Sequence, residues 1–552
     1  MGKGRMGNWA DRGGRAAATA RRVAGQVARQ AAERTGPIRA SALRSAERAW
    51  REYGRPYGRK YGRRYAYAPT RWVVGVAAGS GLVLVVVSIA VAGPWQGGQR
   101  VGDRALAEGR PSAAARHGGR PGTPKPAGPA WHDAADVLAP ASGSGTLPTA
   151  AGLGGTLAGP MGVSVLGRVT ASVVDVTDGH TLYSVGADQA QEPASTNKIA
   201  TATAALSLLG PDHRFTTKVV GDAATGLTLV GGGDPTLSAS SGPDSLTALA
   251  AATAAALRAQ ASPSASSGAS ASAAPLGGGH RITLHYDISL FSAPALHPIG
   301  VNENIALVQA LTADEGRLDP TSTENAPREA DPALHAANAF AAALTADGVD
   351  VDTSPSQGTA PANAPQLAQV QSAPLSDIVE RMLTESDNDV AEALGHAVAL
   401  ASGRPATFTD AAAAVTARLA RLGIRLGSTH LADSSGLSGD DGIPAAVLTQ
   451  LLVLDASPAH PELRSVISGL PIAGFTGTLD NRYGGAGSEA GLGVVRAKTG
   501  TLQTVNTLAG LVVDRSGRPL AFAFMSNGSG SQDAARAALD VLASRLATCG
   551  CG

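Results

Sequence analysis

A serine and a lysine three residues apart, Ser195 and Lys198, are the first sign of chemistry in this chain. They lie in "EPASTNKIATATAAL", whose Ala- and Leu-rich run predicts a helix that begins near Ser195. Side chains three positions apart in a helix share a face, so the amine can reach the hydroxyl. A serine needs an adjacent base to become a useful nucleophile. The pair predicts such a serine, although a helix-capping serine beside a solvated lysine has the same pattern.

Lysine is scarce in the C-terminal part of the chain, which sharpens this prediction. From residue 161 onward there are 18 arginines but only three lysines, Lys198, Lys218 and Lys498. Arginine is effectively always protonated, whereas a desolvated lysine can lose its proton near neutral pH. We therefore expect a lysine where a proton has to be accepted.

Two more short motifs follow along the chain. "TESDNDVAEALGH" contains Ser-Asp-Asn at 386–388, and "GVVRAKTGTLQTVN" contains Lys-Thr-Gly-Thr at 498–501, at the end of a strand-like run. The set S-x-x-K, S-D-N and K-T-G in this order resembles the signature of penicillin-binding proteins and serine β-lactamases. Three motifs in order, which use two of the three lysines, are hard to produce by chance.

The distance between the first two motifs narrows the resemblance. Ser195 and Ser386 are 191 positions apart, far more than a compact β-lactamase domain needs. The chain resembles the low-molecular-mass class C penicillin-binding proteins, the D-alanyl-D-alanine carboxypeptidase/endopeptidase family of serine peptidases, which carries an inserted domain there. "LVGGGDPTL", "YDISLF", "ADSSGLS" and "LPIAGFTGTLDNR" are also similar to that family. The similarity covers roughly residues 161–545.

The resemblance implies a fold and a reaction. The fold is α+β, a penicillin-binding/serine β-lactamase-like transpeptidase fold with an antiparallel sheet flanked by helices and an inserted, mostly β domain. Ser195 would attack the D-Ala-D-Ala peptide bond of peptidoglycan stem peptides, with Lys198 as the proton acceptor. Ser386 would relay a proton to the departing amine. β-Lactams would acylate the same serine as covalent inhibitors.

The remaining motif residues would bind the substrate. Lys498 would attract the free carboxylate of the substrate and act as a second cation beside Lys198. The side chains of Asn388, Thr499 and Thr501 would donate hydrogen bonds to the substrate, and Gly500 would let the substrate lie close to the strand. The backbone N–H groups of Ser195 and Thr501 would hold the oxyanion. No cofactor is implied, and the 11 histidines form no HExxH metal motif.

Alternative functions remain open at this point. Carboxypeptidase and endopeptidase activities would use the same residues, so the motifs do not separate them. A β-lactamase-like hydrolase is disfavoured by the long insertion and by the lack of a recognisable deacylation glutamate motif. A catalytically silent peptidoglycan-binding or sensing protein is disfavoured by the intact motifs.

The elements that must position these residues are visible at both ends of the region. "VSVLGRVTASVVDV" and "TDGHTLYSV" predict a hairpin around an Asp178-Gly179 turn, and "VNTLAGLVVD" and "PLAFAFMSNG" predict a second hairpin. An amphipathic helix follows in "SQDAARAALDVLASRLA". We expect one sheet covered by the first and last helices. The middle contains strand-like "GLTLVGGG" and "HRITLHYD" and a Ser/Ala-rich segment, 261–279, that predicts a disordered loop.

The N-terminal part differs in charge from the rest. Residues 1–71 hold 18 basic and 4 acidic residues, whereas the remainder holds 27 basic and 40 acidic ones. Between them, Val73 to Ala92 are 20 uncharged, mostly apolar residues, enough to span a bilayer as a helix. The basic flank predicts a cytoplasmic N-terminus and an extracytoplasmic C-terminal bulk. A cleaved signal peptide is the rival interpretation.

These patterns predict six segments. The tail, 1–71, is expected to be mostly disordered and attracted to anionic lipids, with nucleic-acid or protein binding as the alternative. A transmembrane anchor is expected at 72–92 and a Gly/Ala/Pro-rich linker at 93–160. The peptidase domain is expected in two parts, 161–215 and 371–548, with the inserted domain at 216–370 between them.

Overall fold

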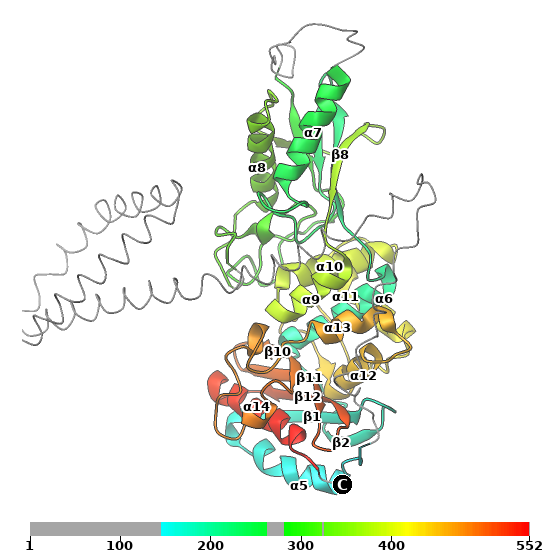
Figure 1. Ribbon diagram of the computed structural model, residues 1–552, viewed down its shortest axis with the longest axis vertical. Coiled ribbons are helices and arrows are strands. Elements are labelled where there is room, and N and C mark those ends of the chain that lie inside the picture. The colour runs from blue at the N-terminus through cyan, green and yellow to red at the C-terminus, as the bar shows by residue number, and fades with distance from the viewer. Residues whose placement is uncertain (1–144, 262–280, 323–324, 551–552) are drawn as a thin grey trace, which may run out of the picture. The chain divides into compact units, whose positions relative to one another are not determined.

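The computed structural model describes residues 145–261, 281–322 and 325–550, and Figure 1 shows their helices and strands. The predicted basic tail, the predicted membrane segment and most of the predicted linker lie outside these ranges, as does nearly all of the Ser/Ala-rich segment. Among the helices that the structure describes, none combines the length and the apolar character needed to cross a membrane.

The first sheet joins the two ends of the described chain. Its five strands run in the order β10-β11-β12-β1-β2, and every neighbouring pair is antiparallel. Both predicted hairpins, β1–β2 and β11–β12, are present. The strands span Arg168–Asp175 (β1), Thr181–Val185 (β2), Arg496–Thr501 (β10), Val505–Val513 (β11) and Pro519–Asn527 (β12).

Helices cover both faces of this sheet. Strand β12 needs cover on both faces because its apolar side chains point to both. Successive side chains of a strand point to opposite faces, and here the large residues Leu520, Phe522 and Phe524 join one hydrophobic cluster. The residues between them, Ala521, Ala523 and Met525, join the other cluster. Helices α5 (Ala150–Met161) and α14 (Gln532–Ala547) contribute to the first cluster, and α12 (Ala445–Asp455) packs on the second face.

Helix α5 differs from the expected linker. The sequence places the start of ordered structure near Met161, but residues 150–161 already form a helix. Its run AAGLGGTLAGPM holds four glycines and a proline, which are weak helix formers. Leu153 and Leu157 are fully buried, and the helix packs against α14, so tertiary contacts overcome the poor propensity.

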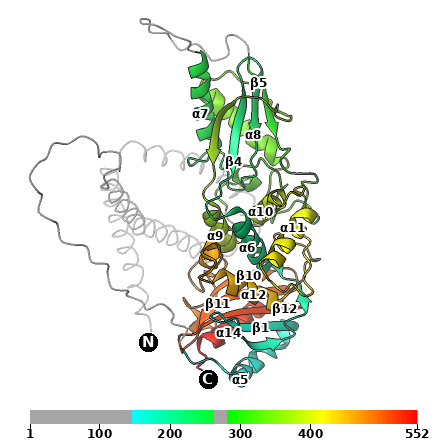
Figure 2. The same ribbon diagram turned by 90° about the vertical axis from the view of Figure 1, so that its right-hand side faces the viewer.

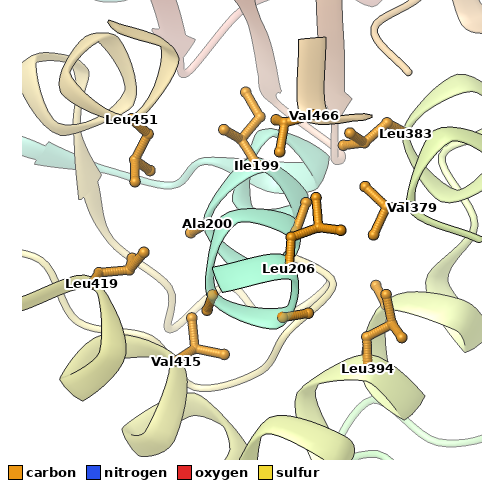
Figure 3. Close-up of a cluster of buried hydrophobic side chains, with 14 of the residues drawn as sticks. Ile199, Ala200, Leu206, Val379, Leu383, Leu394, Val415, Leu419, Leu451 and Val466 are labelled. Carbon is orange, nitrogen blue, oxygen red and sulfur yellow. The ribbon is translucent and has the colours of Figure 1, made fainter. Parts of the chain in front are cut away.

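Helix α6, Asn197–Leu209, is the centre of the helical layer and has no exposed face over its first ten residues. Figure 3 shows Ile199, Ala200 and Leu206 facing side chains of the surrounding helices, such as Val379, Val415 and Leu451. Most of the stability of such a buried helix comes from packing against its neighbours. The surrounding helices are α9 (Leu375–Glu385), α10 (Asn388–Ala401), α11 (Phe408–Arg421), α12 and α13 (Arg464–Ser468).

The inserted domain forms its own sheet and core (Figure 2). Helices α7 (Leu246–Ala261) and α8 (Pro332–Ala346) pack on the sheet, so the domain mixes helix and strand rather than being mostly β as expected. The strand order is β7-β6-β5-β4-β8, with β5–β6 and β6–β7 parallel. The strands span Thr216–Asp222 (β4), Gly226–Val230 (β5), Leu284–Asp287 (β6), Ser356–Gln357 (β7) and Gln366–Gln371 (β8).

Short elements complete the described chain. Strands β3 (Ala190–Gln191) and β9 (Ile443–Pro444) form a two-stranded antiparallel sheet. The 3₁₀ helices span Ser164–Leu166 (η2), Ala194–Thr196 (η3), Asp314–Gly316 (η4), Pro461–Leu463 (η5), Gly477–Leu479 (η6) and Glu489–Gly491 (η7).

Candidate active site

Ser195 lies in the 3₁₀ turn η3, directly before helix α6 rather than inside it. The preceding Ala194 has a positive φ of 47°, which an L-residue adopts only when its surroundings enforce it. The Nζ atom of Lys198, in the first turn of α6, donates a hydrogen bond of 3.0 Å to the Oγ atom of Ser195. The helix is held rigidly by its buried surface, so the pair has a fixed geometry.

The amine of Lys198 is fully buried and uses all three of its N–H donors. Besides Ser195, it donates to the Oδ1 atom of Asn388 at 2.6 Å and to the carbonyl oxygen of Ser435 at 2.8 Å. Burial lowers the pKa of Lys198 from 10.5 to about 8, and nearby carboxylates, Asp433 first among them, oppose this shift. An appreciable fraction of the amine is therefore neutral near physiological pH, as a general base must be.

The second motif lies at the junction of two helices. Helix α9 ends at Glu385, Ser386 adopts the left-handed conformation with φ 62°, and Asp387 caps α10 by accepting a hydrogen bond of 3.0 Å from the N–H of Val390. This sharp turn places Ser386 on the same cavity as Ser195. The Nδ2 group of Asn388 donates to the carbonyl oxygen of Asn304, so its amide is held at both ends.

The third motif occupies strand β10 at the edge of the sheet. Lys498 is fully buried and donates to the carbonyl oxygen of Thr499 at 2.9 Å. Burial, together with the charge of Lys198, holds the pKa of Lys498 well below its usual range. Lys498 does not line the cavity, so in this structure it has no direct contact with that space.

Close packing explains why residue 500 is a glycine, which the sequence did not reveal. A Cβ atom at this position would lie 2.1 Å from the Oγ1 atom of Thr507 and 2.6 Å from the carbonyl oxygen of Pro193. The same Thr507 hydroxyl donates to the carbonyl of Pro193 at 2.8 Å. Glycine therefore lets the strand contact the turn that carries Ser195, in addition to leaving room beside the strand.

A cavity of about 830 Å³ brings the predicted residues together. Side chains from all three motifs line it, namely Ser195, Ser386, Asn388, Thr499 and Thr501, whereas Lys198, Lys498 and Gly500 lie behind its surface. The motifs did not predict other residues of the lining, which include Thr478, Arg482 and Arg536. Thr478 and Arg482 belong to the family-like run "LPIAGFTGTLDNR", which was the available signal for them.

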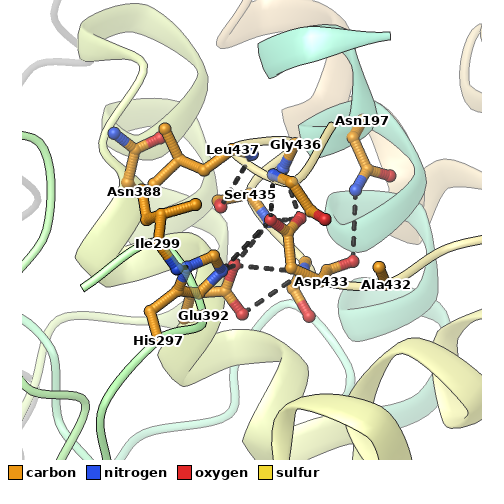
Figure 4. Close-up of polar contacts among 12 residues, drawn as sticks. Asn197, His297, Ile299, Asn388, Glu392, Ala432, Asp433, Ser435, Gly436 and Leu437 are labelled. Atoms are coloured by element: carbon orange, nitrogen blue, oxygen red, sulfur yellow. Dashed lines mark hydrogen bonds and ion pairs between the residues drawn. The ribbon is translucent and has the colours of Figure 1, made fainter. Parts of the chain in front are cut away.

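A buried cluster of His297, Glu392 and Asp433 lies beside Ser435 (Figure 4). The N–H of Ser435 donates to Glu392 at 2.8 Å and to Asp433 at 3.0 Å, while the carbonyl of Ser435 accepts from Lys198. The Nε2 atom of His297 lies 3.2 Å from Asp433. Burial raises the pKa of Glu392 to about 7. The family-like run "ADSSGLS" therefore supplies a backbone partner for Lys198, through the carbonyl of Ser435.

Comparisons with known proteins show the family of the chain. Residues 161–261 and 315–548 match the model of the D-Ala-D-Ala carboxypeptidase 3 (S13) family. The chain is 37% identical to the carboxypeptidase DacB of Mycolicibacterium smegmatis, over 88% of this chain and 99% of that protein. It is 39% identical to a carboxypeptidase of Mycobacterium tuberculosis, over 75% of this chain and 87% of that protein.

A solved structure supports the predicted fold. The crystal structure of penicillin binding protein 4 (dacB) from Haemophilus influenzae matches with a TM-score of 0.55 and 22% identity, over 72% of this chain and 98% of that chain. The expectation of a penicillin-binding fold, with an antiparallel sheet flanked by helices, is confirmed.

Proposed function

The chain belongs to the D-Ala-D-Ala carboxypeptidase 3 (S13) family, and on that premise we propose that Ser195 is its nucleophile and Lys198 its general base. It is a serine D-Ala-D-Ala carboxypeptidase. The substrate is the D-Ala-D-Ala end of a peptidoglycan stem peptide. One observation carries the assignment of the two residues, the hydrogen bond of 3.0 Å between the Nζ atom of Lys198 and the Oγ atom of Ser195.

Acylation follows from the positions of the first two motifs. When Lys198 is neutral, its lone pair accepts the hydroxyl proton of Ser195 as the Oγ atom attacks the carbonyl carbon of the scissile bond. The backbone N–H groups of Ser195 and Thr501 hold the developing oxyanion; removal of one such donor typically costs about 10²- to 10³-fold in rate. Ser386 passes a proton to the departing D-Ala amine, which leaves the shortened peptide as an ester on Ser195.

Substrate binding and deacylation use the rest of the cavity. Thr499 and Thr501 line the cavity where the terminal carboxylate of the substrate is expected. A carboxylate bound there would favour the protonated form of Lys498, which lies buried behind the wall. Asn388 keeps one N–H of its amide for the substrate backbone, because a single N–H satisfies Asn304. Water then hydrolyses the ester and restores the hydroxyl of Ser195.

The experiment that tests these roles uses the purified full-length chain. Release of D-Ala from a peptide ending in D-Ala-D-Ala is measured together with the intact mass after incubation with benzylpenicillin. We expect D-Ala release and a mass increase of one drug molecule, both lost in Ser195→Ala. Penicillin consumption without an adduct would instead indicate a β-lactamase-like hydrolase. Absence of both reactions would indicate a catalytically silent binding protein.

Endopeptidase activity is a second proposal for the same site. The cavity continues from Ser195 to Asp533 and Arg536 at the start of α14, which leaves room for a second peptide chain beyond the scissile bond. We expect a cross-linked dimer of stem peptides to be cleaved at the D-Ala bond. Release of D-Ala from monomers without cleavage of purified dimers would contradict this second activity.

A membrane anchor at residues 73–92 is the third proposal. The apolar run and the excess of basic residues before it support a single span with the N-terminus in the cytoplasm, the catalytic domain outside and the tail on anionic lipids. We expect the chain in the membrane fraction of cells, with its C-terminal part open to external protease. Recovery of a soluble form that begins near residue 93 would instead indicate a cleaved signal peptide.

A further inference from the structure

A loop of the inserted domain contacts the start of helix α10. It connects β6 to α8 and spans residues 288–331, of which 288–322 and 325–331 are described. We call it the inserted loop. Its carbonyl at Asn304 accepts from the side chain of Asn388 at 3.0 Å, and its N–H at Ala306 donates to Asp389 at 2.8 Å. These contacts join an inserted segment to the motif that carries Ser386, although the two are some 80 residues apart in the sequence.

Two arginines of the inserted loop lie next to each other and face this motif. Arg317 and Arg328 are paired across an antiparallel bridge, which the hydrogen bond of 3.0 Å from the N–H of Leu318 to the carbonyl of Pro327 closes. The guanidinium of Arg317 lies 2.8 Å from Asp387, and that of Arg328 lies 2.9 Å from Asp389. Their side chains are 5% and 3% exposed, so solvent screens these ion pairs little.

The guanidinium of Arg317 joins two buried carboxylates at once. Its NH2 group donates to Asp387, and its NH1 group is paired with Glu315, which is paired in turn with Arg381 on helix α9. A planar guanidinium presents two donors in a fixed fork, whereas a lysine amine is a point charge. Without Arg317, Asp387 would lose its ion pair, whereas Glu315 would keep Arg381.

Asp387 connects its ion pair with Arg317 to the two neighbouring motif residues, Ser386 and Asn388. Its carboxylate accepts from the N–H of Val390 and so sets the start of α10, directly between Ser386 and Asn388. Ser386 is held in the left-handed conformation, and Asn388 contacts Lys198 at 2.6 Å. A shift of Asp387 would therefore displace the proton relay and the partner of the general base together.

We propose that Arg317 of the inserted loop is a positioning residue for the reaction, acting through Asp387 on Ser386 and Asn388. The inference rests on the proposed function, because it takes the roles of those two residues from it. Arg317 does not line the cavity, so it contributes to catalysis without touching the substrate. Misplacement of a reacting group by about 1 Å can cost about 10²-fold in rate.

The test separates positioning from mere stability. Arg317→Gln and Arg317→Lys are made in the full-length chain, and the number of acylatable sites is titrated by long incubation with benzylpenicillin. D-Ala release is then expressed per titrated site. We expect kcat per site to fall about 10²-fold in Arg317→Gln and less in Arg317→Lys, with a much smaller change in KM.

Arg281→Gln is the matched control. Arg281 also belongs to the inserted domain and pairs with Asp350 at 3.3 Å, but both side chains are largely exposed, at 62% and 47%. We expect this variant to match the parent in both titre and kcat per site.

Each outcome decides the inference. A lower titre with an unchanged kcat per site in Arg317→Gln would mean that Arg317 only stabilises the fold, which overturns the proposal. If Arg317→Gln does not fold, Arg317→Lys decides: a reduced kcat per site supports positioning, and the parent rate overturns it. A parent chain that releases no D-Ala refutes the proposed function and this inference with it, whereas an active parent with unaffected variants refutes the inference alone.

Discussion

Lysines of the catalytic and inserted domains occupy opposite environments. Lys198 and Lys498 of the catalytic domain are fully buried beside the cavity, and each has a lowered pKa. Lys218 lies on β4 of the inserted domain and is only partly buried. Rarity of a residue type therefore points to chemistry only where the fold also desolvates the side chain. The scarcity of lysine after residue 161 points to Lys198 and Lys498 and not to Lys218.

Carboxylates divide less strictly between the two domains, because Asp234 and Asp287 of the inserted domain are buried as well. Glu392 and Asp455 of the catalytic domain are buried, and burial raises the pKa of each. The pair of Arg281 and Asp350 in the inserted domain stays in solvent. Buried ionisable groups concentrate in the catalytic half and where the inserted loop meets it. The cost of burying them is tolerated where they position other groups.

The largest effect is expected when the buried lysine and the partly buried lysine are each replaced by arginine. Lys198→Arg keeps the charge but cannot accept a proton, so we expect the rate of acylation by benzylpenicillin to fall by about 10²- to 10⁴-fold. Lys218→Arg is the matched control and should acylate at the parent rate. Stopped-flow or mass-spectrometric acylation kinetics measure both. Near-normal acylation of Lys198→Arg would refute the lysine as base.

The next effect concerns the contact between strand β10 and the nucleophile turn. Gly500→Val would place a side chain against the carbonyl of Pro193, so the strand and Ser195 must separate. We expect about a 10²-fold loss of D-Ala release. Gly439→Val is the matched control, because Gly439 has open space around it and no positive φ, and this variant should be active. Gly179 would be a poor choice because its φ is positive. Full activity of Gly500→Val would contradict the packing account.

The pH dependence of acylation should follow the protonation state of the buried Lys198. Because burial lowers the pKa of Lys198 to about 8, the neutral base predominates above that pH and is lost as the pH falls. We expect the acylation rate at pH 7 to be about tenfold below its alkaline plateau, if the protonated lysine is inactive. A rate that does not change between pH 6.5 and 9 would exclude this titration.

A smaller effect, on stability alone, is expected at Asp455. Its buried carboxyl lies 3.0 Å from the hydroxyl of Thr203, which donates to the carbonyl of Ile199. Burial raises its pKa well above the usual value. The folded state therefore keeps a proton that the unfolded chain releases above about pH 4, so stability falls as the pH rises from there towards the raised pKa.

Asp455→Asn removes this dependence, because an amide can donate to Thr203 without ionising. We expect Tm at pH 8 to rise by about 2 °C, with less gain at pH 5. Asp350→Asn in the exposed pair should change Tm at both values of pH by less than that. Thermal unfolding followed by circular dichroism measures both variants. An equal gain at the two values of pH would contradict the titration of Asp455.

Much of the fold could be predicted because its signals are local. The alternation in β12 and the apolar run of α6 set strand and helix within a few residues of their observed bounds. Helix α5 could not be predicted, because its glycines oppose a helix and only the burial of Leu153 and Leu157 stabilises it. The helices of the inserted domain were missed as well, since its strand-like runs dominated the pattern.

The sequence by itself determined the reaction class, because the order and spacing of the three motifs restrict it. It also determined that Ser195 and Lys198 would be neighbours, since three positions of a helical turn suffice for that. Only the tertiary structure decided what surrounds Lys198. Asn388 and Ser435 lie 190 and 237 positions away along the chain, and Arg317 reaches Asp387 across 70. Such contacts depend on how whole elements pack, and no local pattern of residues encodes that packing.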